Sequence, residues 1–494
     1  MRFKGPLANS YPAAVALVLC ALVPYLVLST ALTPLTPLIS KSLGLSQQAM
    51  QLTFGMANAA YAFGTVAAVQ FAVHLRGRRM LLGYALLFVI GSVLAAGAWT
   101  PGLFIAGHIV QGLCTSLMLI AAVPPLVIGW PSSKMPWTGA TMNMGIFGAV
   151  ALGPVIGGVQ AGASAWRPLF WIVAGVGALA LLFVVLTFED QEPQDRSAPW
   201  DWVAQGLAGV GCAAVFFGAS ELETHPFVSP IVLIPLLGGL ALVFVLVAYE
   251  YLAENPLMPM RSLSSTFPVA GIVVAITAGA ASVAIVELVQ MALQTKMSPT
   301  HLGMLFWPEF GGAVATAMLF GLIFRTRFVP LLAFLGLLTL AAGAAVFTGV
   351  TSGSDAIVLV GSGLVGLGVG ASVSPALFAA GFSLKNEQLP RVFALIELLR
   401  GVAAFMVGPI LLHVAQTVGG NPRSGTKTAI WICLGIAVAG AAISALVVLL
   451  GRARLQAPDL DTWLEGEGPA IDSPPLLAAV RGEREAVGTG VSGL

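Results

Sequence analysis

Three carboxylates stand inside long apolar stretches of this sequence, where charged side chains are rare. They are Glu287, Glu309 and Glu397. If these stretches cross a membrane, each carboxylate costs on the order of 3 kcal/mol to insert, so each is a candidate functional group. Removal from water favours the neutral form of a carboxyl group, which is the property that a proton carrier needs. We therefore take all three as candidate proton-coupling residues.

Each carboxylate also has a structural explanation. Glu397 and Arg400 are three residues apart, which places them on one helical face as a charge pair that neutralises itself. Glu309 follows Pro308 near the start of its apolar run, where interfacial water is within reach. Glu287 has Gln290 nearby and no basic neighbour, so it is the first candidate for proton coupling.

His108 is a fourth candidate proton carrier, because the reference pKa of imidazole lies near neutrality. A histidine that is hydrogen-bonded inside a helical core is the alternative. Polar and aromatic residues in other apolar runs are candidates for lining a substrate cavity, or else for joining helices by hydrogen bonds and packing. These cavity candidates are Tyr25, Phe54, Asn58, Tyr61, Gln111, Asn143, Gln290 and Trp307.

The composition indicates which solvent surrounds these residues. Of the 494 residues, 58% are hydrophobic and 9% are charged, whereas a soluble domain carries about 25% charged residues. A lipid bilayer is the solvent that suits such a chain. The net charge of +1 argues against a nucleic-acid partner. No metal-ligand spacing, nucleotide-binding lysine motif or Ser/His/Asp set occurs, so we expect neither a metal, a cofactor nor an enzyme.

A window of about twenty apolar residues, the length that crosses a bilayer, predicts fourteen spanning helices in an all-α membrane protein. They lie near residues 13–38, 48–73, 80–99, 102–129, 139–161, 168–188, 201–222, 229–252, 266–293, 301–324, 328–350, 355–383, 392–417 and 427–450.

Basic residues are distributed unequally between the two sets of loops. Cytoplasmic loops carry an excess of Lys and Arg, and with the N-terminus inside, the inner loops hold fourteen basic residues and the outer loops five. We therefore expect a multi-pass protein of the cytoplasmic membrane with both termini in the cytoplasm. The inner set is Arg2, Lys4, Arg76, Arg78, Arg79, Lys134, Arg196, Arg261, Arg325, Arg327, Lys385, Arg391, Arg452 and Arg454, and the outer set is Lys41, Arg167, Lys296, Arg423 and Lys427.

The chain divides by composition into five parts. We expect an N-terminal six-helix bundle in residues 1–188, and a charged, proline-containing cytoplasmic linker in 189–200. Two extra spanning helices follow in 201–252, and a second six-helix bundle occupies 253–450. The remaining residues, 451–494, are polar and rich in Gly and Pro, which is typical of a disordered cytoplasmic tail.

One motif in the fifth predicted helix combines a proline with three glycines. Proline removes a helical hydrogen bond and bends the helix, whereas the glycines leave a groove for a neighbouring helix. Basic residues follow a glycine between the second and third helices. The two motifs are Gly153, Pro154, Gly157 and Gly158, followed by Trp166 and Arg167, and Gly77, Arg78 and Arg79.

These two motifs resemble those of the major facilitator superfamily, and in particular its fourteen-helix drug/proton antiporter branch. Gln111 and Gly112 also stand where the family has an Arg-x-x-Gln-Gly motif. The resemblance covers roughly residues 13–450. It implies two six-helix bundles with two additional central helices between them. The glycine and basic motifs would then be conformational elements of such a fold.

The resemblance further implies a secondary active transporter, usually monomeric, that exports hydrophobic or amphipathic small molecules in exchange for protons. Several family positions differ here: His74 and Leu75 replace an Asp and an Arg, His108 replaces an Arg, and Leu28 replaces an acidic residue. A proton-independent facilitator or lipid-like carrier is therefore an alternative. A membrane scaffold or sensor that transports nothing is another.

Overall fold

The computed structural model describes residues 5–188, 193, 197–258, 260–419 and 421–476. Within them, fourteen helical stretches are long and apolar enough to cross a membrane, which confirms the predicted number. In chain order they are α1 (Tyr11–Leu43), α2 (Gln47–His74), α3 (Gly77–Ala96), α4 (Pro101–Ile128), α5 with α6 (Met135–Asn143 and Ala149–Gly162), α7 (Arg167–Thr187), α8 (Trp202–Ser220), α9 (Pro230–Leu252), α10 (Thr266–Leu293), α11 with α12 (Pro299–Met304 and Trp307–Ile323), α13 (Val329–Phe347), α14 (Asp355–Phe382), α15 (Leu389–Thr417) and α16 (Pro422–Leu450).

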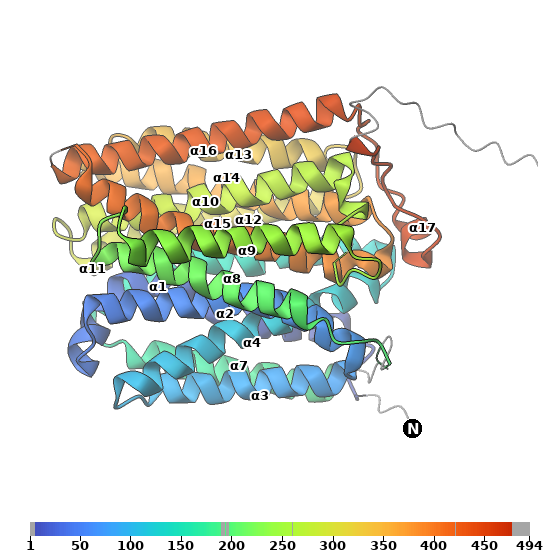
Figure 1. The fold of residues 1–494 in the computed structure, drawn as a ribbon, viewed down its shortest axis with the longest axis horizontal. Helices are drawn as coiled ribbons and strands as arrows, with labels where there is room; N and C mark the ends of the chain where they lie inside the picture. Colours follow the sequence, from blue (N-terminus) through green and yellow to red (C-terminus); the bar gives the residue numbers. More distant parts are fainter. Residues whose placement is uncertain (1–4, 189–192, 194–196, 259, 420, 477–494) are drawn as a thin grey trace, which may run out of the picture.

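The helices form two bundles with a pair of helices between them, as predicted. Helices α1 to α7 make the first bundle and α10 to α16 the second, and Figure 1 shows them on opposite sides of the molecule. The extra helices α8 and α9 pack against each other and lie across the boundary between the bundles. Helix α8 contacts α2 of the first bundle and α15 of the second. The extra pair is therefore placed to contribute residues to the space between the bundles.

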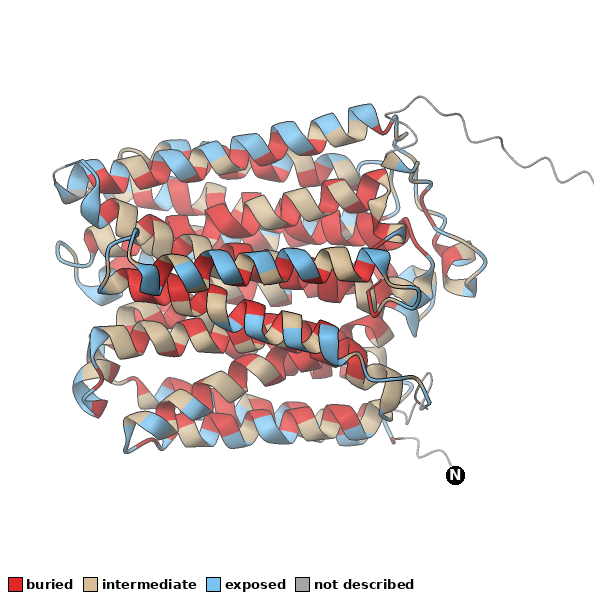
Figure 2. Cartoon of the chain, viewed as in Figure 1, coloured by how far each residue is buried: buried red, intermediate tan, exposed pale blue. Residues whose placement is uncertain are grey.

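The outer surface of the spanning helices is apolar. Phe244 on α9, Leu322 on α12 and Leu449 on α16 are 73%, 80% and 74% exposed, and exposed residues run along the outer helices in Figure 2. Such side chains are stable outside the protein only if lipid surrounds them. The same helices satisfy their own backbone hydrogen bonds, which lipid cannot do.

Two predicted helices differ from their expected form. The stretch predicted at 301–324 is two helices, because Pro308 lacks an amide hydrogen and stands in the first turn of α12, after α11 has ended. The helix predicted at 139–161 begins earlier, and a π-helical turn at Met144–Gly148 joins α5 to α6. Such turns insert an extra residue into a helix and shift the faces that precede and follow it.

The two ends of the bundle are distinguished by the chain termini. Because the number of spans is even, α1 begins and α16 ends at the same end, which we call the terminal end (right in Figure 1). The other end is the distal end.

Some of the residues covered by the predictions from sequence lie outside the described residues. They are Arg2, Lys4 and most of the 189–200 linker, including Arg196.

The segment after α16 folds back onto the terminal end and includes a short helix, α17 (Leu460–Glu465). Trp463 of this helix is fully buried, and its Nε1 donates a hydrogen bond to the Leu384 carbonyl at 2.7 Å. The amide of Ala470 donates to the Phe382 carbonyl at 2.8 Å. The predicted disorder is therefore wrong for residues 451–476, because the buried tryptophan and the hydrogen bonds to the second bundle outweigh their polar composition. Residues 477–494 lie outside the described residues.

Trp463 extends an aromatic cluster that fills the terminal end of the second bundle. The rings contact one another with centroids 5.1 to 5.9 Å apart. On the side of the first bundle, a Cβ atom added to Gly139 of α5 would collide with the Phe324 ring. The two bundles thus meet closely at the terminal end. The cluster consists of Phe320, Phe324, Phe378, Phe382, Phe393 and Trp463.

Replacing Trp463 with alanine is expected to release the segment that follows α16. Loss of a buried tryptophan costs about 3 kcal/mol, which is on the order of a hundredfold in the equilibrium between docked and undocked segment. Limited trypsin digestion measures this, because cleavage after Arg452 or Arg454 would become correspondingly faster. Trp431→Ala on the surface of α16, where the side chain is 52% exposed, is the matched control; equal cleavage of both variants would contradict the docking.

Candidate functional site

A cavity of about 420 Å³ lies between the bundles in the distal half of the molecule. This volume falls within the range of small-molecule sites. Gln294 and Gln416 at its rim are exposed, so the cavity opens toward the distal end. Its polar lining residues are Ser29, Thr33, Thr36 and Ser40 from α1, Gln47, Gln51 and Asn58 from α2, Ser220 and Glu223 from α8 and the turn after it, Glu287 from α10 and Gln294 just after it, and Gln416 from α15.

Two polar stripes form much of this lining. On α1 the lining residues recur every three or four positions from Ser29 to Ser40, which places them on one helical face. On α2 a similar spacing joins Gln47, Gln51 and Asn58. Of the eight cavity candidates from the sequence, Asn58 and Phe54 line the cavity. The sequence signal for the missed lining residues of α1 was the regular spacing of their small hydroxyl side chains. This signal is weak, because Ser and Thr are common in membrane helices.

Glu287 is half-buried and lines the cavity from α10. A glycine of the facing helix leaves room for it, because a Cβ atom added to Gly408 of α15 would collide with a Glu287 carboxylate oxygen. Neither Lys nor Arg occurs among the described residues that line the cavity. The Glu287 carboxyl group therefore stands in the cavity without a neutralising partner from its walls.

Glu309 is deeper and does not line this cavity. Its side chain is 5% exposed, and its Oε2 atom has no hydrogen-bond partner among the described residues. It borders a void of about 20 Å³ together with Thr30, Ser282 and Val286, a volume too small for an organic molecule. Since Val286 and Glu287 are consecutive on α10, this helix separates the void from the larger cavity. Its low exposure removes the contact with interfacial water that Pro308 suggested.

Glu397 and Arg400 of α15 form a buried ion pair. The Arg400 Nη2 atom donates to Glu397 Oε2 at 2.6 Å, and its Nε donates to both carboxylate oxygens at 3.2 Å. Across the interface between the bundles, the Tyr61 hydroxyl of α2 donates to Glu397 Oε2 at 3.4 Å. The Tyr61 ring stacks on Tyr25 with centroids 6.0 Å apart. This arrangement joins the bundles and leaves Glu397 neutralised.

His108 is buried within the first bundle. Its Nδ1 lies 3.1 Å from Gln111 Oε1, and Gln111 Nε2 donates to Ser92 Oγ at 3.0 Å. The rings of Tyr25, Phe54 and Phe104 have centroids 5.7 to 6.1 Å from the imidazole. Gln111 and His108 therefore belong to one hydrogen-bonded core network, and neither lines the cavity.

The remaining cavity candidates have three different positions. Asn143 joins the bundles, because its Nδ2 donates to the Gly370 carbonyl at 2.8 Å and its Oδ1 accepts from Ser374 Oγ at 3.0 Å. Gln290 is buried outside the cavity lining, with its Oε1 lacking a partner among the described residues. Trp307 is 44% exposed and lies near the start of α12.

The glycine motif of α6 packs against both bundles. A Cβ atom at Gly153 or Gly157 would collide with the backbone of α1, and one at Gly158 would collide with Pro299 and Gly303 of α11. Pro154 stands within α6, and a Cβ atom at Gly303 would approach its carbonyl. The bundles thus touch at the distal end along α6 and α11, whereas the cavity lies between α1, α2, α10 and α15.

The basic loop motif lies at the terminal end, at the start of α3. Gly77 is the first residue of α3, and the Arg78 Nη2 atom donates to the Val185 carbonyl of α7 at 3.3 Å. Arg79 follows in the same first turn. The preceding His74 stacks on Trp200 with centroids 4.4 Å apart. This motif therefore contacts α7 and the segment before α8, far from the cavity.

Two carboxylates that the sequence did not single out have defined positions. Glu223, in the turn after α8, lines the cavity and hydrogen-bonds Gln47 of α2. Glu250 near the end of α9 is fully buried, and its Oε2 accepts the Met258 amide at 2.9 Å. Both lie in the extra helix pair close to helix ends: Glu223 directly follows the predicted helix 201–222, and Glu250 stands in the last turn of the predicted helix 229–252.

Comparison with known sequences matches this chain to a transporter family and to proteins named for drug efflux or resistance. The family model described as Major Facilitator Superfamily matches residues 17–286. A protein of Mycobacterium tuberculosis named "Multidrug resistance protein B homolog" is 28% identical over 369 residues, which cover 71% of this chain and 66% of that protein. The "Drug efflux pump JefA" of the same species is 24% identical over 356 residues, which cover 69% of this chain and 68% of that protein. The first match thus spans less than two thirds of the relative.

Solved structures resemble the fold over most of the chain. The human organic anion transporter MFSD10 superposes with a TM-score of 0.61 at 14% identity, covering 88% of this chain and 99% of that one. The peptide-transporter-family (POT) protein PepTSo gives a TM-score of 0.59 at 12% identity, covering 90% and 98%. At these identities the likeness concerns the fold alone.

Replacing Arg400 with methionine is expected to destabilise the protein strongly. The change leaves Glu397 buried without its partner, which costs about 3 kcal/mol or more. Thermal unfolding of the purified protein measures the loss. In the double variant Glu397→Gln with Arg400→Met no uncompensated charge remains, so most of the stability should return. A single variant as stable as the parent, or a double variant no better than the single one, would contradict a structural ion pair.

Proposed function

We propose that this chain, which belongs to the major facilitator superfamily, is a secondary active transporter that exports amphipathic small molecules in exchange for protons. The observation that carries the proposal is Glu287, an intramembrane carboxyl group that faces a cavity of about 420 Å³ between the bundles. The names of the Mycobacterium tuberculosis relatives, a multidrug resistance protein homolog and a drug efflux pump, support export as the direction.

The lining supports an amphipathic substrate. Leu32, Phe54, Met291 and Phe405 supply apolar surface, and the stripes on α1 and α2 supply hydroxyl and amide groups. Pockets of this size and mixture bind drug-sized molecules by apolar burial with a few oriented polar contacts. A substrate held between α1 and α10 contacts both bundles at once, so the rocking of one bundle against the other would carry it across.

For the proton we assign Glu287 as the group that exchanges with the cavity, and Glu309 as a second group sequestered from it. Glu287 is accessible and Glu309 is 5% exposed. Burial without a hydrogen-bond partner among the described residues favours the neutral form of a carboxyl group. Glu397 is not assigned a coupling role, because Arg400 pairs with it at 2.6 Å. His108 stays a candidate that this arrangement does not require.

The orientation follows from the charge distribution and is part of the proposal. The loops at the terminal end carry most of the basic residues, so we place this end in the cytoplasm. The cavity then opens outward, and the close contact of Gly139 with Phe324 closes the cytoplasmic side. This is the state in which an exporter releases its substrate and accepts a proton from outside.

Replacing Glu287 with glutamine is expected to abolish proton-driven transport while the fold is kept. In proteoliposomes, an imposed pH gradient should drive accumulation of rhodamine 6G by the parent protein. The variant should accumulate the dye at least about tenfold more slowly, because one essential proton-transfer group typically contributes that much or more to the rate. Exchange of the dye without a gradient should persist, because glutamine keeps the shape of the side chain. Glu309→Gln should likewise lose gradient-driven accumulation and keep exchange without a gradient.

The matched control is Glu254→Gln, because Glu254 is exposed and lies between α9 and α10. Its transport should equal that of the parent. If both intramembrane variants keep gradient-driven transport, the coupling groups lie elsewhere. If the parent transports dye at a rate independent of the pH gradient, the protein is a facilitator instead, as the changes at His74, Leu75 and Leu28 would allow.

A further inference from the structure

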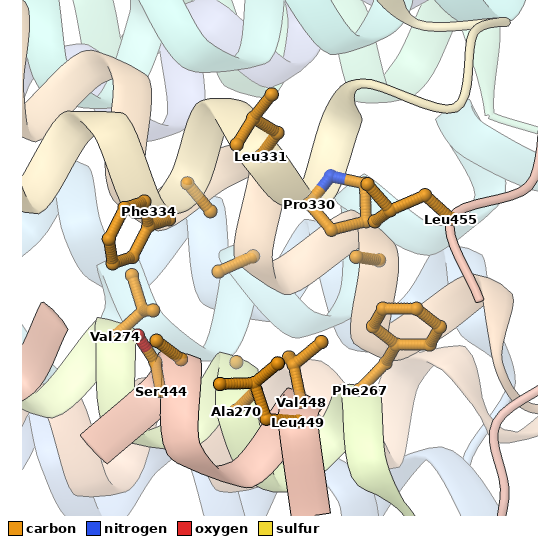
Figure 3. A pocket seen from close by; sticks show the side chains of 15 residues that line it. Phe267, Ala270, Val274, Pro330, Leu331, Phe334, Ser444, Val448, Leu449 and Leu455 are labelled. Carbon is orange, nitrogen blue, oxygen red and sulfur yellow. The ribbon is translucent and has the colours of Figure 1, made fainter. Parts of the chain in front are cut away.

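A second pocket, of about 270 Å³, lies in the second bundle away from the cavity. Helices α10, α13, α14 and α16 form its walls, and Leu455 of the segment after α16 closes one end (Figure 3). Nearly all of its lining is apolar. Among the described lining residues Ser444 has the one polar side chain, and its hydroxyl already donates to the Ala441 carbonyl at 3.0 Å. The pocket therefore offers burial for an apolar group and no hydrogen bond.

The pocket runs along the helix axes from the terminal end into the membrane-spanning region. Phe267 and Leu455 lie at the outer part, and Val274 and Ser444 lie deeper (Figure 3). Phe267 and Val274 are seven residues apart on α10, which corresponds to about 10 Å of depth at the helical rise. A lipid acyl chain enters a bilayer in this same direction, from the interface toward the centre.

Basic residues stand around the mouth of the pocket. Arg452 and Arg454 follow α16, immediately before the lining residue Leu455, and Arg327 precedes the lining residue Pro330 by three positions. All three side chains are exposed. Three residues of chain span at most about 10 Å, so the charges lie near the level at which lipid phosphates would stand. The acidic Asp459 of the same segment is engaged by Thr462, whose amide donates to it at 3.2 Å.

We propose that this pocket binds an anionic phospholipid, with one acyl chain between α10, α13 and α16 and the phosphate beside Arg452 and Arg454. The bilayer that surrounds these helices supplies the ligand, and the arginines favour an anionic head group over a zwitterionic one. Because Leu455 is both a wall of the pocket and part of the docked segment, the bound lipid also holds that segment against the bundle. This site is independent of the proposed transport cycle.

Native mass spectrometry of the purified full chain tests the proposal, with phosphatidylglycerol and phosphatidylcholine of identical acyl chains as probes. We expect the parent to retain one phosphatidylglycerol molecule. Ala445→Phe fills the pocket from α16 and should lower retention at least tenfold. The matched control is Ala442→Phe, on an exposed face of the same helix outside the pocket lining, and it should retain lipid as the parent does. Equal retention by both variants would overturn the site.

The head-group part of the proposal has its own variant. Arg452→Gln with Arg454→Gln should reduce the preference for phosphatidylglycerol over phosphatidylcholine by about tenfold, whereas Arg423→Gln at the distal end should leave the preference unchanged. An unchanged preference in the double variant would overturn the role of the arginines. Thermal unfolding of each variant verifies that it is folded, and lipid retention is measured without transport, so the result does not depend on the proposed export function.

Discussion

The hydrocarbon core of a bilayer cannot hydrogen-bond, and this constraint governs how the polar residues of the molecule are arranged. Most buried polar side chains are satisfied inside the protein. Asn143 makes two hydrogen bonds to α14, and Glu397 is held by Arg400. Against that background the exceptions carry information. Among the described residues, Glu309 Oε2 finds no hydrogen-bond partner beside its small void, and no Lys or Arg lines the cavity that Glu287 faces. Carboxyl groups without partners inside a membrane protein are costly, and this is why we propose that both take part in proton coupling.

Small residues decide where the bundles touch and hence where the cavity can be. At Gly158 and Gly303 the backbones of α6 and α11 approach so closely that a Cβ atom would collide. At Gly139 the ring of Phe324 occupies the space that a side chain would take. These contacts join the bundles at both ends on the α5–α6 side. The opening is therefore confined to the faces of α1, α2, α10 and α15, where the polar stripes lie.

The sequence predicted the number of helices and the two-bundle fold well, because lipid forces each span to be long and apolar. It predicted the cavity lining poorly. Tyr25, Gln111 and Asn143 are polar or aromatic in apolar runs, as expected for lining residues, yet they bond within or between bundles. Which face of a helix meets a cavity depends on its rotation and partners, and membrane helices lack the one-sided pattern that reveals this in soluble proteins. The docked segment was missed for a related reason: a single buried tryptophan and a few hydrogen bonds to the second bundle hold it, and neither changes the polar composition of the segment.

Helix α10 has a special place in the proposed coupling. Its successive residues Val286 and Glu287 face two different spaces, the void of Glu309 and the larger cavity. Gly408 of α15 is what allows the Glu287 carboxyl group to stand at the cavity wall. A rotation of α10 about its axis, through up to about 100° since consecutive helical residues differ by that angle, would move Glu287 from the cavity toward the void and change the access of both carboxyl groups together. Proton binding and bundle movement would then be coupled through one helix, with no carboxylate needed in the first bundle.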